Sequence, residues 1–156
     1  MPGPLRMRRD LTAPLAPAAF PPGVVLADFD RDIAPACRDL MNRAYGETGD
    51  TPVGFAGWYG RLTGDTEYDP ALVWVAMGGG QVIGFCQGWS VPFIKDLVVE
   101  QRWRGRGLGS ALLTLAMQTY AERGDASVEL KTEPENREAQ SLYRRLGFAV
   151  VERIDG

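Results

Sequence analysis

The alternation of apolar and polar positions is most regular over residues 94–123, where it predicts a buried strand followed by a long helix. Residues 94–99 form a short apolar run rich in β-branched side chains, which favours a strand. Leu108, Leu112 and Leu115 then recur with the spacing of one helical face. Gly124 is typical of the residue that follows a helix.

The rest of the chain carries shorter patterns of the same two kinds. Helices are predicted over residues 33–44, 53–62 and 136–146, and strands over residues 24–29, 72–77, 81–89, 128–132 and 148–154. Asp32 and Gly46 are expected to cap the first helix at its two ends. A hairpin followed by strand, helix and strand indicates an α/β or α+β layered sheet.

The turn before the long helix is expected to bind a ligand with phosphate groups. Gly105, Gly107 and Gly109 remove three side chains where the helix begins. Backbone N–H groups at that end lack partners within the helix, and the helix dipole makes them an anion site. Arg104 and Arg106 add positive charge.

Two other phosphate-binding motifs do not fit the residues of this turn. A dinucleotide-binding fingerprint requires glycine where Ser110 stands, and a P-loop requires a lysine that is missing here. A glycine turn with a purely structural role stays open.

Composition limits the classes of function. The 156 residues suit one domain, and a net charge of −3 gives no basic footprint for nucleic acid. No apolar run is long enough to span a membrane, and no secretory signal is recognisable, so a cytoplasmic protein is expected. The absence of histidine excludes histidine-dependent triads and argues against a zinc site.

The N-terminal segment divides into two parts. Residues 1–22 hold six of the eleven prolines, and residues 13–22 are interpreted as a linker. Residues 5–11 suit either a short strand or a disordered, arginine-containing tail.

Two motifs together resemble the GNAT superfamily of acyl-CoA-dependent N-acetyltransferases. The first is Arg104-x-x-Gly107-x-Gly109 after a strand, and the second is N-x-x-A-x-x-L-Y-x-x-x-G-F over residues 136–148. The resemblance covers residues 23–155. It implies a strongly bent, mostly antiparallel sheet flanked by helices, with one parallel pair, residues 94–99 and 128–132, splayed apart.

That fold normally closes with two antiparallel strands after the Gly-Phe pair, and here residues 148–154 supply one. We therefore expect residues 5–11 to take the position of the missing last strand, because an unfilled position would expose a sheet edge. They would do so within one chain or swapped between the two chains of a homodimer. On this interpretation residues 1–22 are a strand and linker, and residues 23–156 form a single N-acetyltransferase domain.

The resemblance implies acetyl-CoA as cofactor. Its pyrophosphate would lie on the turn, and the backbone of the central strand would bond its pantetheine arm like an added strand. Asn136 would cap the last helix and also contact the cofactor. The residues of the strand and the turn that are predicted to bind the cofactor are Leu97, Val98, Val99, Arg104, Gly105, Arg106, Gly107, Leu108, Gly109 and Ser110.

The chemistry needs a neutral amine, a stabilised oxyanion and a proton for the leaving thiolate. By resemblance Tyr143 is the general acid, although its pattern alone suits a core aromatic. The oxyanion would be held by the N–H of Val98 or Val99. Asp96 is the first candidate for the base.

Alternatives for the base stay open. Glu47 and Asp50 are second candidates, each of the three carboxylates equally suits a solvated surface position, and the amine could lose its proton to water. Lys131 stands where some family members place a carboxylate.

The function predicted is transfer of an acetyl group from acetyl-CoA to a primary amine, by direct attack in a ternary complex. The acceptor would be a small amine or a peptide N-terminus, bound near aromatic residues of the segments 45–59 and 89–93. A non-catalytic acyl-CoA-binding domain of the same fold is the rival, and a nucleotide-binding domain is a third possibility.

Overall fold

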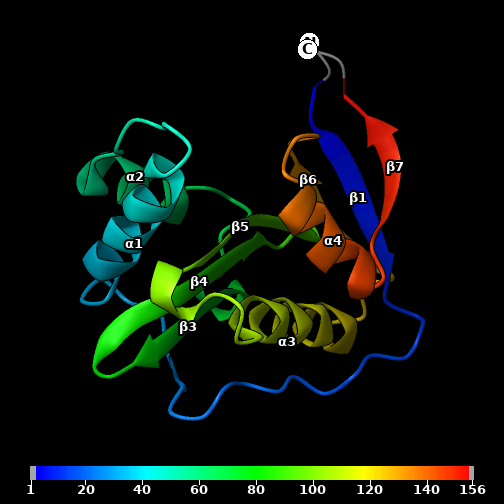
Figure 1. Ribbon diagram of the computed structural model, residues 1–156, viewed down its shortest axis with the longest axis horizontal. Helices are drawn as coiled ribbons and strands as arrows, with labels where there is room; N and C mark the ends of the chain where they lie inside the picture. The colour runs from blue at the N-terminus through cyan, green and yellow to red at the C-terminus, as the bar shows by residue number, and fades with distance from the viewer. Residues whose placement is uncertain (1–2, 155–156) are drawn as a thin grey trace.

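The computed structural model describes residues 3–154, and within them seven strands form one sheet in the order β2-β3-β4-β5-β6-β1-β7 (Figure 1). All neighbouring strands are antiparallel except β5 and β6. The strands are β1 (Leu5–Asp10), β2 (Val25–Ala27), β3 (Val73–Gly78), β4 (Gln81–Trp89), β5 (Phe93–Val99), β6 (Ser127–Thr132) and β7 (Ala149–Arg153). The helices are α1 (Ala34–Gly46), α2 (Phe55–Thr63), α3 (Leu108–Glu122) and α4 (Arg137–Arg145), with short 3₁₀ turns η1 (Pro70–Leu72) and η2 (Gln101–Trp103).

Helices cover both faces of the sheet and produce two apolar cores. On one face, α3 packs with residues of β6 and β1, among them Leu112, Leu130 and Met7. On the other face, α1 and α2 pack over β3 and β4, with Leu40, Leu62 and Phe85 in the core. The predicted bent, mostly antiparallel sheet with one parallel pair is therefore confirmed. No helix in residues 3–154 has the length and apolar content that crossing a membrane requires.

An irregularity in β5 separates the sheet into two halves. Gln87 of β4 pairs with Asp96, whereas the next residue, Gly88, pairs with Ile94, so Lys95 is an extra residue in β5. Such a bulge bends a strand and increases its twist. The pairing of β5 with β6 is short, at Phe93↔Glu129 and Ile94↔Leu130, and the two strands diverge beyond it.

Strand β1 occupies the position predicted for residues 5–11, between β6 and β7 of its own chain (Figure 1). Its register places Leu5 opposite Thr132 of β6 and opposite Arg153 of β7. Met7 is fully buried in the α3 core. The reading of this segment as a disordered tail is wrong.

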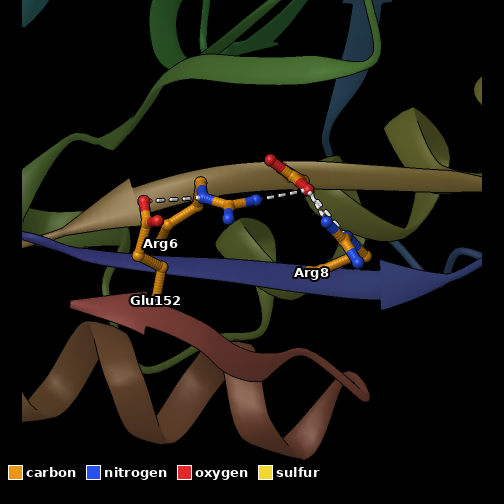
Figure 2. Close-up of polar contacts among 4 residues, drawn as sticks. Arg6, Arg8 and Glu152 are labelled. Carbon is orange, nitrogen blue, oxygen red and sulfur yellow. Dashed lines mark hydrogen bonds and ion pairs between the residues drawn. The ribbon is translucent and has the colours of Figure 1, made fainter. Parts of the chain in front are cut away.

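The opposite side of β1 carries an ionic cluster. Glu129 of β6 accepts hydrogen bonds from Arg6 and Arg8, with N···O distances of 2.8 and 2.7 Å. Figure 2 shows both arginines on β1, with Glu152 of β7 bonded to Arg6 at 3.4 Å. These pairs link β1 to the strands on both of its sides.

The segment between β1 and β2 runs past α3 without regular secondary structure (Figure 1). Leu15 and Phe20 pack against the α3 core, and the side chain of Gln118 donates to the carbonyl of Ala16 at 3.0 Å. The proline-rich segment therefore lies on the domain surface rather than extending away from it.

Three local predictions need correction. The start of α1 is stabilised by Asp30 rather than Asp32, because Asp30 Oδ1 accepts from the backbone N–H groups of Asp32 and Ile33 at 3.0 and 2.9 Å. Gly46 is the last residue of α1, not the residue after it.

Strand β2 is shorter than the predicted strand over residues 24–29. Beyond it, the side chain of Phe29 packs in an aromatic cluster with Trp58 and Phe85.

Replacing Met7 by Ala should lower the free energy of unfolding by about 2–5 kcal/mol, because the side chain fills a closed core. Chemical denaturation measures this. Leu26→Ala, on the exposed edge strand β2, is the control and should change it by less than about 0.5 kcal/mol. Equal small effects of both substitutions would show that β1 is only loosely attached.

Replacing Glu129 by Gln should make stability less dependent on pH in acid. Burial raises the pKa of Glu129, but hydrogen bonds from Arg6 and Arg8 lower it overall below the usual 4.5. Its ionised form therefore stabilises the fold above pH 4.5, and this contribution is lost as the pH falls through the folded-state pKa. At neutral pH the free energy of unfolding of the variant should be lower than that of the parent by up to about 1 kcal/mol. Between neutral pH and pH 3 the free energy of unfolding, measured by chemical denaturation, should fall less for the variant than for the parent. The same pH dependence in both proteins would contradict this.

Candidate active site

The glycine-rich turn presents bare backbone at the start of α3. Gly105 and Gly107 have φ of 77° and 86°, which favours glycine, and Gly107 is the N-cap of the helix. Gly109 lies between β5 and α4, since a methyl group there would lie 3.6 Å from Val99 Cγ2 and 3.7 Å from Leu142 Cδ2. The turn thus offers unobstructed N–H groups beside the diverging edge of β5, with Leu108 buried beneath it and Ser110 in the first turn.

Arg104 holds the turn against two other elements. Its Nε donates to the carbonyl of Val99 at 3.1 Å, and its two terminal nitrogens lie 2.6 and 2.8 Å from the carboxylate of Glu47, at the end of α1. The hydrogen bond from Arg104 lowers the pKa of Glu47. Arg104 is therefore paired, whereas Arg106 is exposed and stacks 4.8 Å from the ring of Trp103.

The backbone N–H and C=O groups of successive β5 residues point alternately to the two edges of the strand. The N–H of Glu100 donates to Ile83 of β4, and the register then places the hydrogen-bonding groups of Val98 toward Phe85 of β4. Those of Leu97 and Val99 point to the other edge, where pairing with β6 has ended. Of the three residues predicted to bind pantetheine through their backbone, Leu97 and Val99 point away from β4 and Val98 does not. The unpaired edge of β5 beyond its last pair with β6, at Ile94, is called the opening below.

Asp96 lies on the α1 side of β5, where the hydroxyl of Tyr45 donates to its Oδ1 at 2.5 Å. Burial, followed by the charge of Asp96, raises the pKa of Tyr45, so its hydroxyl stays a donor. The carboxylate predicted as the base is therefore held by a tyrosine that the sequence had suggested only as pocket lining.

Tyr143 is half-buried on α4, with its ring centroid 6.0 Å from that of Phe148. Burial, with a smaller contribution from Cys86, raises its pKa to about 12. The phenol is therefore protonated at neutral pH. Its contacts with the core agree with the sequence pattern of a core aromatic, and its role as general acid stays a prediction.

The remaining predicted residues have other partners or lie at the surface. Asn136 caps α4, with its Oδ1 accepting from the N–H of Ala139 at 3.1 Å. Glu47 is occupied by Arg104, and Asp50 is exposed. Lys131 is exposed, with its Nζ 5.9 Å from the ring of Phe93. Residues 3–154 hold no cluster of three or more His, Cys, Asp or Glu side chains suited to a metal.

The sequence analysis did not predict one buried residue of this region. Arg38 is only 5% exposed and lies on the face of α1 that also carries Tyr45. The signal available was its spacing, since Arg38, Asn42 and Tyr45 follow one another at intervals of four and three residues.

Comparison with known proteins decides the family. A family model described as the acetyltransferase (GNAT) family matches residues 34–148. The chain belongs to the GNAT acetyltransferase family. The match contains the glycine turn, β5, α3 and α4.

Named relatives of this GNAT chain include two mycothiol acetyltransferases. The protein from Thermobispora bispora is 32% identical over 155 residues, which cover 92% of this chain and 52% of the relative. The protein from Clavibacter sepedonicus is 32% identical over 134 residues, which cover 83% of this chain and 44% of the relative.

Solved structures extend the comparison. A GCN5-related N-acetyltransferase from Sphaerobacter thermophilus superposes with a TM-score of 0.83 at 29% identity, over 97% of this chain and 49% of that one. The aminoglycoside N-acetyltransferase AAC(6')-Iy in complex with CoA has a TM-score of 0.69 at 19% identity, over 85% of this chain and 92% of that one, and so shares the fold. The chain spans about half the length of the mycothiol relatives and of the Sphaerobacter protein.

Replacing Glu47 by Gln should tighten the binding of coenzyme A by about two- to five-fold, measured by calorimetry. The substitution removes a negative charge beside an anion site and releases Arg104 from an exposed ion pair worth at most about 1 kcal/mol. Asp50→Asn, which removes a charge from the same loop, is the control and should have little effect. Weaker binding by the Glu47 variant would mean that Glu47 instead holds Arg104 ready for the ligand.

Proposed function

We propose that this chain transfers an acetyl group from acetyl-CoA to a primary amine by direct attack in a ternary complex. One observation carries the proposal: the glycine turn that begins α3 lies against Val99 of β5, at the edge that has no strand partner beyond Ile94 in the described part of the chain, and the same strand carries Asp96. The names of the relatives, as acetyltransferases, and membership of the GNAT family support the same reaction.

The cofactor would lie along β5 and across the turn. The diphosphate of acetyl-CoA would bind the N–H groups of residues 105–110, with Arg106 as a cation and Arg104 as a second one once it exchanges Glu47 for the ligand. The pantetheine arm would bond the backbone of Leu97 and Val99. The side chain of Asn136, already the cap of α4, is proposed to contact the cofactor through its amide nitrogen.

The reaction requires an amine without its proton. Asp96 would accept that proton, directly or through water, as the amine nitrogen attacks the thioester carbonyl. The backbone N–H of Val99, which points into the opening, would stabilise the oxyanion. When the C–S bond breaks, the electron pair leaves with sulfur as a thiolate.

Tyr143 would donate a hydrogen bond, and then its proton, to the departing sulfur. Its pKa of about 12 lies above the ~8.5 of a thiol, so complete transfer is uphill unless it accompanies bond breaking. The proton would therefore pass to sulfur as the C–S bond breaks, and the Tyr143 phenolate would regain a proton from solvent.

The acceptor is proposed to be a small amine or a peptide N-terminus. Tyr45 and Trp58, on α1 and α2, would form one wall of its site. A cytoplasmic location is proposed because both Cys37 and Cys86 are free and buried. A homodimer would most readily use the edge strand β7, where Val150 and Val151 are 40% and 42% exposed.

Replacing Tyr143 by Phe should lower kcat by about 100-fold or more, because it removes the proton donor to sulfur. Release of coenzyme A from acetyl-CoA with a panel of amines measures the rate. The affinity for acetyl-CoA, measured by calorimetry, should change little.

Cys86→Ser is the control, since that thiol is fully buried and has no role in the proposed reaction. Tight binding of acetyl-CoA by the parent protein without transfer to any amine would favour the non-catalytic binding domain. Failure to bind acetyl-CoA at millimolar concentration would overturn the assignment altogether.

A further inference from the structure

The acceptor side of the opening contains a buried cation without an ionic partner. Arg38 of α1 is 5% exposed, and within residues 3–154 no carboxylate oxygen comes within the 4.0 Å of an ion pair. Buried charges are normally paired, because removing a guanidinium from water is costly. The fold therefore holds a charge here that its own side chains do not neutralise.

The guanidinium is held in place by groups that leave its outer nitrogens unused. Its Nε donates to Asn42 Oδ1 at 3.0 Å, and its central carbon lies 5.4 Å from the ring centroid of Trp58. Asn42 is itself fixed by two hydrogen bonds with the backbone of Val53. No fully enclosed nitrogen in the described chain lacks a partner, so the two terminal nitrogens of Arg38 are reached by solvent.

The charges around Arg38 leave a net positive site. Burial lowers the pKa of Arg38, Asp96 opposes that shift from a distance beyond an ion pair, and Arg61 of α2 adds to it as a like charge. The carboxylate of Asp96 is already bonded to Tyr45. The carboxylate that acts on Arg38 is thus already engaged, and the anionic group of a ligand would stabilise the guanidinium.

We propose that Arg38 binds a carboxylate of the acceptor, so that the substrate is an amino acid or a similar small amine with a neighbouring carboxylate. The planar guanidinium offers two parallel donors that match a carboxylate. The amino group of the same molecule would then be directed at Asp96. This inference rests on the proposed acetyl transfer and specifies its acceptor.

The first test uses the unmodified protein and matched acceptors. Glycine, L-serine and L-cysteine are compared with their carboxamides, with acetyl-CoA fixed and coenzyme A release as the readout. A carboxamide has the less basic amine, so more of it is neutral and chemical reactivity alone favours it. A kcat/KM at least about ten-fold higher for the free acids is expected, from the worth of hydrogen bonds to a charged group. Equal or better use of the carboxamides would overturn the inference.

The second test uses Arg38→Gln, with Arg31→Gln as the control. Arg31 is exposed and lies 5.8 Å from the ring of Tyr59, so its loss removes a charge from the same aromatic cluster. Arg38→Gln should raise KM for the free acids by about 10- to 100-fold and leave carboxamide kinetics within about three-fold. Its unfolding temperature should not fall, because an unpaired buried charge has been removed.

Other results of the second test decide against the inference. An equal loss with acids and carboxamides, together with lower stability, would make Arg38 a structural residue of α1. If the variant does not fold, the comparison of acids with carboxamides decides alone.

If acetyl-CoA binds but no amine reacts, the proposed function fails. The inference is then decided by calorimetric titration of the acids and carboxamides into the acetyl-CoA complex, where no preference for the acids would refute it.

Discussion

The extra residue in β5 is the constraint on which the arrangement of the site depends. On one side of Lys95, Ile94 belongs to the core beneath α3, and on the other side Val98 belongs to the core beneath α1 and α2. The bulge thus reverses which face of the sheet each side chain meets. It also ends the pairing with β6, which leaves backbone groups of β5 beside the glycine turn and directs Asp96 toward α1.

The half of the sheet beyond this opening is joined to the rest mainly through the core beneath α3. Only two register pairs join β6 to β5, so β6, β1 and β7 with α4 form a subassembly. Arg9 of β1 donates to the carbonyl of Leu146 at the end of α4 and lies against Gly147, where a side chain would clash with it. The position of Tyr143 on α4 therefore depends on a strand more than 130 residues away in the sequence.

Features set by neighbours in the sequence were predictable. The spacing of Leu108, Leu112 and Leu115 predicted α3, and the cap of α4 by Asn136 followed from residue type and position. The placement of β1 was predictable because the family fold requires a strand that the C-terminal segment does not supply. Asp30 replaced Asp32 as the group that begins α1, because both carboxylates suit that role and the local backbone conformation decides between them.

Features that join distant segments were not predictable. Nothing near Glu47 in the sequence indicates a bidentate pair with Arg104, and nothing near Arg38 indicates burial without a counter-ion. Lys95 reads as an ordinary polar residue in an apolar run, yet it marks the bulge from which the opening begins. These residues acquire their roles only when α1 packs against β5, which is a tertiary event.

The place of β1 in the sheet also determines the order in which the chain can fold. Residues 5–10 pair with residues 127–132 and 149–153, so they cannot pair until those two strands have been synthesised. Until then, Leu5, Met7 and Leu11 have no core to enter and present an apolar strand to the cell. Such long-range pairing slows folding and exposes the nascent chain to aggregation. Proline-rich sequence directly after the strand, and arginines within it, would help to keep this waiting segment from pairing with other chains.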